Sequence, residues 1–162
     1  MRLFIILLIF INSFEAIAQK KMPDGIVKNL AGKEVNLSGL VGQGKVIVLS
    51  FWATWCAPCK KELDAYTLVY EEWKKKYPVE IIAVSIDQTR AIPKIAPMVK
   101  EKGWKFPIYT DENSSLTTKF GFQAIPQTYL IDKKGNIFSS HSGFTTNAEK
   151  IIEEEIKKAI KS

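Results

Sequence analysis

The stretch that decides the fold reads FWATWCAPCKKE and occupies residues 51–62. It contains the only two cysteines of the 162-residue sequence, Cys56 and Cys59. An apolar run precedes it at residues 46–49, and a segment with helical spacing of its apolar residues follows it. This order predicts a buried strand, a short turn and a helix, with the two thiols placed where the helix begins.

A helix start is a favourable place for a thiolate, because its first N–H groups lack intrahelical partners and its N-terminus carries partial positive charge. We therefore expect Cys56 to ionise readily and to be the attacking nucleophile, with Cys59 as the resolving thiol. Pro58 can stand in the first turn without losing a needed hydrogen bond, and it stiffens the loop between the sulfurs. Local electrostatics and the Ala57-Pro58 dipeptide can tune the reduction potential.

Three other interpretations of the cysteine pair remain open. A structural disulfide that closes a loop of roughly four residues would contribute only about 2 kcal/mol. A metal site normally needs three or four protein ligands, and only His141 is left to join two thiolates. A pair of inert buried cysteines would fit the neighbours Trp52 and Trp55, but the strand-to-helix position argues against it.

Residues 51–53 (FWA) followed by residues 55–60 (WCAPCK) resemble the active site of the thioredoxin superfamily. The continuation KEL at residues 61–63, and FPIYTD at residues 106–111, resemble its exported TlpA/ResA-like branch. That branch contains bacterial thiol-disulfide oxidoreductases, some of which serve cytochrome c maturation. The resemblance runs from about Asp24 to the end of the chain. It implies an α/β, thioredoxin-like fold: a central mixed β-sheet flanked by helices, with an N-terminal β-hairpin extension and an inserted helix.

Residues 1–18 are expected to be a signal peptide, so that residues 19–162 form the thioredoxin-like domain. Arg2 supplies a positive start, residues 3–11 are apolar, and Ala16-Ile17-Ala18 fits the small-residue cleavage pattern. The apolar run is shorter than the ~20 residues that span a bilayer, and an uncleaved membrane anchor is the alternative. Export with a single CxxC pair indicates an oxidising compartment such as the periplasm.

Composition indicates an ordinary globular protein of about one domain, with 46% hydrophobic and 25% charged residues. The net charge is +6. Lysines and glutamates interleave at residues 71–76 and 153–158, a pattern typical of solvated helix faces. The sequence therefore gives no basic block that would indicate nucleic-acid binding.

The rest of the chain alternates between strand-like and helix-like segments. Strands are expected at 25–36 as a hairpin, at 45–52, 79–86 and 108–110, and at 130–138 as a second hairpin. Helices are expected at 58–76, 87–103 and 114–120, and after Asn147. The strand, helix, strand order of residues 45–86 implies a parallel pair with a right-handed crossover.

Two of these helices have details that the structure can test. The helix at 87–103 should be short or kinked, because Pro93 and Pro97 interrupt its apolar spacing. In the last helix Asn147 is expected to be the cap. Its apolar side is expected to consist of Ile151, Ile152, Ile156 and Ile160.

A second informative pair is Ile125-Pro126, which enters a β-rich run. By itself, a proline there marks a sheet edge or a turn. The thioredoxin resemblance implies more: a cis bond between these residues, and an Ile125 backbone that pairs with a bound substrate chain beside Cys56.

The chain departs from the family at the group that takes the proton of the resolving thiol. Many thioredoxins have a buried aspartate directly before Phe-Trp-Ala, but here that residue is Ser50, which cannot be the base. We hypothesise that Asp87, or a water molecule, manages the proton of Cys59. His141 is expected to be a surface or packing residue.

Together these features predict thiol-disulfide exchange with protein substrates through a mixed disulfide on Cys56, without a cofactor or a metal. The resemblance favours a monomeric reductant that a membrane thiol-disulfide carrier recharges. A peroxidase of this fold would have proline and threonine where Leu49 and Ala53 stand. A further alternative is a binding module without redox turnover, such as a copper carrier or holdase that uses Trp55 and the groove near Pro126.

Overall fold

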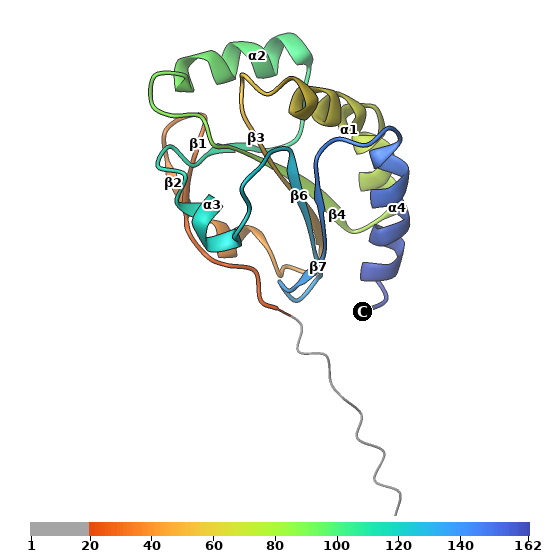
Figure 1. Ribbon diagram of the computed structural model, residues 1–162. Coiled ribbons are helices and arrows are strands. Elements are labelled where there is room, and N and C mark those ends of the chain that lie inside the picture. The colour runs from red at the N-terminus through yellow and green to blue at the C-terminus, as the bar shows by residue number, and fades with distance from the viewer. Residues whose placement is uncertain (1–19) are drawn as a thin grey trace, which may run out of the picture.

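The computed structural model describes residues 20–162, and Figure 1 shows their path. The predicted signal peptide lies outside the described residues. The strands are β1 (Ile26–Asn29), β2 (Glu34–Asn36), β3 (Val46–Trp52), β4 (Val79–Ser85), β5 (Ile108–Thr110), β6 (Gln127–Ile131) and β7 (Ile137–Ser142). The helices are α1 (Ala57–Lys76), α2 (Ile95–Lys102), α3 (Ser115–Phe120) and α4 (Ala148–Ala159), with 3₁₀ helices at Leu37–Leu40 and Ile92–Lys94. None of the helices in this part of the chain is long and apolar enough to cross a membrane.

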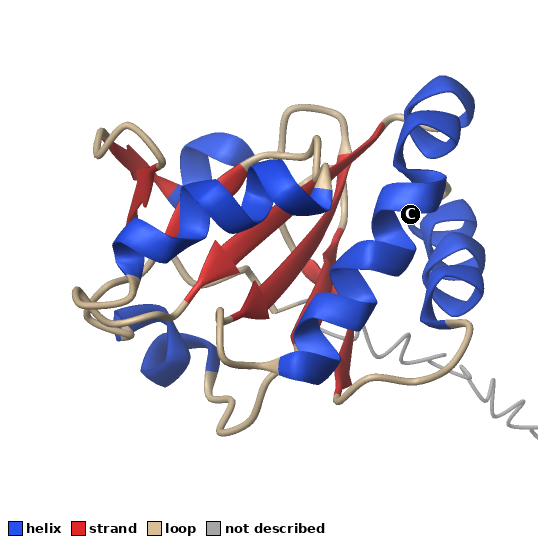
Figure 2. Ribbon diagram, turned by 90° about the horizontal axis from the view of Figure 1, so that it is seen from above, coloured by secondary structure: helices blue, strands red, loops and turns tan. Residues whose placement is uncertain are grey.

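All seven strands form one mixed sheet in the order β2-β1-β5-β4-β3-β6-β7. The central strands β3, β4 and β5 run parallel, as the crossover argument predicted, and β6 and β7 continue the sheet in antiparallel fashion. Figure 2 shows this twisted sheet with helices on both sides. The expected α/β, thioredoxin-like fold is therefore confirmed.

The two faces of the sheet carry separate cores, and β3 contributes to both. Its side chains alternate, so that Val48 and Trp52 pack on the side of α1 and α4 while Leu49 and Phe51 pack on the side of α3. All seven residues of β3 are buried, which explains why its sequence reads as a continuous apolar run interrupted only by Ser50.

The predicted N-terminal hairpin is present. Strands β1 and β2 pair in antiparallel fashion, and Gly32 takes the positive φ of 79° that their turn requires. Strand β1 also pairs with β5, so the hairpin widens the central sheet.

The segment at 87–103 is confirmed as a short, interrupted helix. The 3₁₀ helix at Ile92–Lys94 leads directly into α2. Pro93 and Pro97 both lie in the first turn of their helix, where a missing N–H removes no intrahelical bond. Gly103 ends α2 in the left-handed conformation, with φ of 67°.

The last helix corrects two details. Asn147 is the N-terminal cap residue of α4, but it has a positive φ of 63° and its side chain makes no capping hydrogen bond. Ile151 is not part of the buried face, since it is 43% exposed. The buried residues of α4 are Ala148, Ile152, Ile156 and Ala159.

Candidate active site

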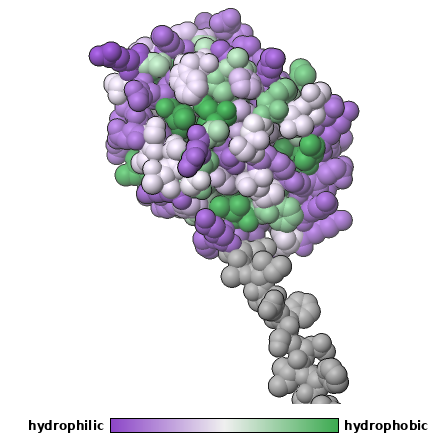
Figure 3. Space-filling view, viewed as in Figure 1, coloured by the Kyte–Doolittle hydropathy of each residue, from purple (hydrophilic) through white to green (hydrophobic). Residues whose placement is uncertain are grey.

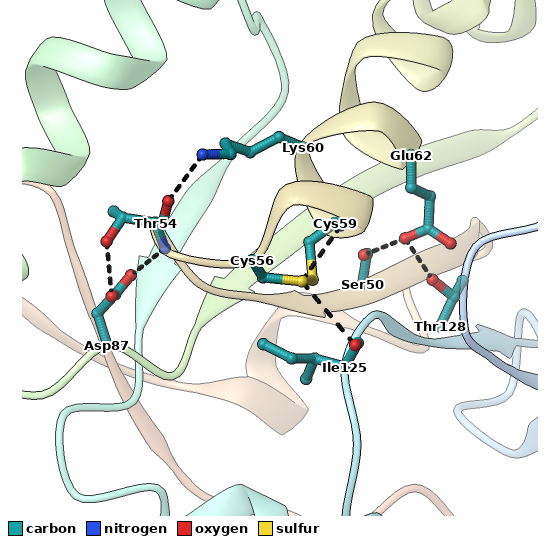
Figure 4. The surroundings of a disulfide bond; sticks show 9 residues. All are labelled: Ser50, Thr54, Cys56, Cys59, Lys60, Glu62, Asp87, Ile125 and Thr128. Atoms are coloured by element: carbon teal, nitrogen blue, oxygen red, sulfur yellow. Dashed lines mark hydrogen bonds between the residues drawn. A yellow bond between two sulfur atoms is a disulfide. The ribbon is translucent and has the colours of Figure 1, made fainter.

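The two cysteines lie where the sequence places them, at the end of β3 and the start of α1, and they form a disulfide (Figure 4). Cys56 is the N-cap residue of α1, and the backbone N–H of Cys59 donates a hydrogen bond to its Sγ over 3.2 Å. Cys56 is 5% exposed, whereas Cys59 is completely buried. Cys56 is therefore the more exposed residue of the pair.

The loop before β6 faces this disulfide. The Ile125–Pro126 peptide bond is cis, which confirms that expectation. The carbonyl oxygen of Ile125 lies 3.9 Å from Sγ of Cys56 (Figure 4). Trp55, which is 69% exposed, lines a groove of about 290 Å³ together with Phe122 and Ile125. The pairing of the Ile125 backbone with a bound substrate chain beside Cys56 stays a prediction.

Asp87, the predicted proton acceptor, is buried on one side of the disulfide and holds the loop that precedes Cys56. Its carboxylate accepts hydrogen bonds from the backbone N–H and the hydroxyl of Thr54, each over 2.8 Å, and from the hydroxyl of Ser85 over 2.7 Å. Lys60 donates to the carbonyl of the same Thr54. The geometry assigns Asp87 a positioning task, and its role as the base for Cys59 stays a prediction.

A second buried carboxyl group, which the sequence reasoning missed, belongs to Glu62. It lies one turn after Cys59 on α1 and is only 2% exposed. Its Oε2 accepts hydrogen bonds from the hydroxyls of Ser50, over 2.8 Å, and Thr128, over 3.1 Å. Burial raises the pKa of Glu62, and the hydrogen bonds from the Ser50 and Thr128 hydroxyls oppose part of that increase. Such a carboxyl group holds a proton more readily than an exposed one does.

Figure 4 shows Ser50 between the sulfur atoms and the Glu62 carboxylate. Serine replaces the strand carboxylate of many thioredoxins, and a carboxylate from the helix reaches the same region instead. The sequence did contain a signal for this: Glu62 falls in the same helical stripe as Cys59, Leu63 and Tyr66, all of which are buried. A charged residue within an apolar stripe is unusual and points to a buried, functional carboxyl group.

The thiols have few groups near them that could complete a metal site. His141 instead forms a hydrogen-bonded pair with Glu155 over 2.8 Å. Within residues 20–162, no three histidine, cysteine, aspartate or glutamate side chains are grouped so that they could hold a metal ion.

Comparison with known proteins agrees with this geometry. The model of the AhpC/TSA family matches residues 18–140. The thiol-disulfide oxidoreductase ResA of Bacillus thuringiensis subsp. konkukian is 35% identical over 139 residues, which cover 86% of this chain and 76% of the relative. ResA of Bacillus subtilis is 30% identical over 78% of this chain and 68% of the relative.

Solved structures show the same fold. The solution structure of an uncharacterized thioredoxin-like protein from Porphyromonas gingivalis superimposes with a TM-score of 0.76 at 32% identity, covering 86% of this chain and 92% of that one. The names of these relatives support redox activity rather than a binding module without turnover. The chain belongs to the AhpC/TSA family, in its branch of ResA-like thiol-disulfide oxidoreductases.

Proposed function

We propose that this protein reduces disulfide bonds in other proteins outside the cytoplasm. One observation carries the proposal: Sγ of Cys56 caps a helix, faces the Ile125 carbonyl and belongs to the more exposed of the two paired cysteines. A thiolate at this place is stabilised by the N–H of Cys59 and by the helix dipole, so the reduced form is both reactive and favoured.

The reaction proceeds in two exchange steps. The thiolate of Cys56 attacks a substrate disulfide, whose S–S bond breaks as a mixed disulfide forms, and one substrate thiolate leaves. Cys59 then loses its proton and attacks Sγ of Cys56, which releases the second substrate thiolate. The enzyme ends with the Cys56–Cys59 disulfide seen here. Two electrons have passed to the substrate, whose two thiolates take up protons from solvent, and the enzyme has given up the one proton of Cys59.

The second step needs a base at a buried thiol, and we assign that task to Glu62. Cys59 and Glu62 are three residues apart on α1 and therefore share a helix face. Glu62 has a raised pKa because of its burial, so it can hold the proton until the substrate thiolate has left.

We further propose that residues 1–18 direct export, that the domain works in the periplasm as a monomer, and that a membrane thiol-disulfide carrier returns its electrons. Two observations support a soluble monomeric domain. The face of the molecule shown in Figure 3 is largely hydrophilic, with hydrophobic side chains in small separate groups. The net charge of +6 also disfavours self-association.

Covalent trapping tests the reaction. The Cys59→Ala variant, expressed with its own N-terminus, should accumulate mixed disulfides with partner proteins that dithiothreitol releases, and Cys56→Ala should accumulate none. Equal trapping by both variants would contradict the assignment of Cys56 as the nucleophile.

A redox titration of residues 19–162, followed by tryptophan fluorescence, tests the direction. A midpoint near or below about −270 mV supports a reductant, whereas a value near about −120 mV would mean that the protein donates disulfides instead.

A further inference from the structure

A cavity of about 20 Å³ lies beside Glu62, between the first turns of α1, the end of β7 and the start of α4. Its polar lining comes from Glu62, Tyr66 and His141, and its outer wall from Gly143, Thr145 and Ile151, which are exposed. This volume is enough for one water molecule. The cavity therefore joins the buried carboxyl group to the protein surface over a short distance.

The inner end of the cavity contains a hydroxyl group that needs a partner. Tyr66 is completely buried, and Glu62 and Thr128 lie near it. Within residues 20–162, however, no hydrogen bond of acceptable geometry reaches its hydroxyl. A buried hydroxyl without a partner costs about 1–3 kcal/mol, so a water molecule in the cavity that bonds both Tyr66 and Glu62 would be held firmly.

A row of polar side chains crosses the sheet beneath these groups. Ser50 on β3 is the cross-strand partner of Thr128 on β6, which in turn is the partner of His141 on β7. Partners across antiparallel strands place their side chains on the same face of the sheet. This face is otherwise covered by the apolar core of α1 and α4, so the row is a polar track within an apolar layer.

The outer end of the track is a pair of titratable side chains. Nε2 of His141 lies 2.8 Å from Oε2 of Glu155 on α4, and Ser139 donates to the same oxygen. The side chain of His141 is 33% exposed and that of Glu155 is 20% exposed. Both groups therefore touch solvent, while Glu62 does not.

We propose that this track is the proton path of the enzyme: one water molecule bound in the cavity carries the Cys59 proton from Glu62 to His141, which exchanges it with solvent. The inference rests on the proposed function, because it assumes that Glu62 accepts the Cys59 proton and adds the steps that follow. His141 takes the proton on one ring nitrogen and releases one to bulk water, so the path is restored after each turnover. The same path returns a proton when the enzyme disulfide is reduced.

The charged groups around the path favour movement in this direction. Glu62 is faced by Ser50 from β3, Thr128 from β6 and His141 from β7. Two carboxylates of α4 lie further along the path, Glu149 near Tyr66 and Glu155 beside His141. Of these groups, His141 alone can carry a positive charge, and its protonated form lowers the pKa of Glu62. A proton that arrives at His141 therefore favours the ionised, receptive form of Glu62.

The test uses the reduced domain and Ellman's reagent, which needs no natural partner. The first thionitrobenzoate release reports attack by Cys56, and the second reports attack by Cys59 on the mixed disulfide. We expect His141→Gln to slow the second release by roughly tenfold at neutral pH and to leave the first release and the midpoint potential unchanged. We expect imidazole in solution to restore the second release in His141→Ala.

Lys102→Met is the matched control. The side chain of Lys102 on α2 is 34% exposed, close to the 33% of His141, and its ion pair with Asp64 on α1 lies away from the path. It should leave both releases unchanged. A His141→Gln variant with a second release of normal rate and normal pH profile would overturn the proposal. So would slowing in His141→Ala that imidazole does not relieve.

A crystal structure of the wild-type domain at high resolution checks the water site independently of the variants. The proposal expects an ordered water molecule within hydrogen-bond distance of Tyr66 and Glu62, and a dry cavity would overturn it. Failure of this path is distinguishable from failure of the proposed function. If the proposed function is wrong, the wild-type protein gives no biphasic release at all, whereas a wrong proton path leaves the biphasic release of the wild type intact.

Discussion

Two buried carboxylates flank the disulfide, and their surroundings differ. Asp87 accepts three hydrogen bonds from Thr54 and Ser85, one of them from a backbone N–H. Glu62 accepts two, both from side-chain hydroxyls, and it borders a cavity that leads to the surface. Burial raises the pKa of Glu62.

This difference explains how one site can be both rigid and able to exchange protons. A backbone N–H can only donate, so the N–H of Thr54 holds the Asp87 carboxylate in place as an acceptor. Hydroxyl groups can rotate to become acceptors, so they tolerate both protonation states of Glu62. The donors around a buried carboxylate, rather than its burial alone, therefore decide its task.

The largest expected effect is on stability, when the hydrogen bonds that Asp87 accepts are removed. Asp87→Ala leaves the N–H and hydroxyl of Thr54 without their acceptor, so we expect the free energy of unfolding to fall by about 3 kcal/mol. Urea titration at neutral pH measures it. Thr54→Val, which removes only the hydroxyl bond, should cost about 1 kcal/mol, and equal losses in the two variants would contradict the anchoring role.

The next effect is on the rate at which Cys59 attacks the mixed disulfide, a step that we assign to Glu62 as base. Glu62→Gln keeps the shape of the side chain but removes the base, so the second thionitrobenzoate release should slow by roughly 100-fold, equivalent to about 2.7 kcal/mol. The first release should be unchanged, because Cys56 is stabilised by the helix start. Equal slowing of both releases would point to a general distortion of the site.

A pH titration of stability sharpens the contrast further. Because burial raises the pKa of Glu62 above its ordinary value of 4.5, the folded state binds this proton more tightly than the unfolded state. Wild-type stability from this group is therefore fully present below pH 4.5 and is lost as pH rises through the folded pKa. Relative to wild type, Glu62→Gln should become more stable over that window. A difference in unfolding free energy that stays constant with pH would contradict the raised pKa.

The smallest expected effect comes from Lys60, which contacts the loop that Asp87 holds. Lys60 donates to the Thr54 carbonyl over 3.0 Å from a partly exposed position. Lys60→Met should lower the free energy of unfolding by only about 0.5 kcal/mol, since exposed charged groups contribute little. Thermal unfolding measures it, and a loss as large as that of Asp87→Ala would mean that the lysine is the main anchor.

Much of the fold could be predicted from the sequence because its signals are local. The apolar run of β3, the Cys56 turn and the glycine turn of the hairpin each depend on residues that are neighbours in the chain. The interrupted helix at 92–102 follows in the same way from two prolines.

The different roles of the two carboxylates, positioning for Asp87 and proton transfer for Glu62, could not be predicted, because they depend on contacts between distant segments. Asp87 meets Thr54 across 33 residues, and Thr128 meets Glu62 across 66. The pairing of β6 with β3 decides which strand hydroxyls face α1. His141 was expected to be a surface or packing residue for the same reason, since its place beside the cavity depends on the register of β7 with β6.

The most direct test of these different roles is the pH profile of the second thionitrobenzoate release in Glu62→Gln and Asp87→Asn, between about pH 5 and 9. We predict that Glu62→Gln loses the rise in rate that Glu62 ionisation produces in wild type, while Asp87→Asn keeps a wild-type profile. A profile that changes in Asp87→Asn and is unaltered in Glu62→Gln would make Asp87 the base and contradict the account.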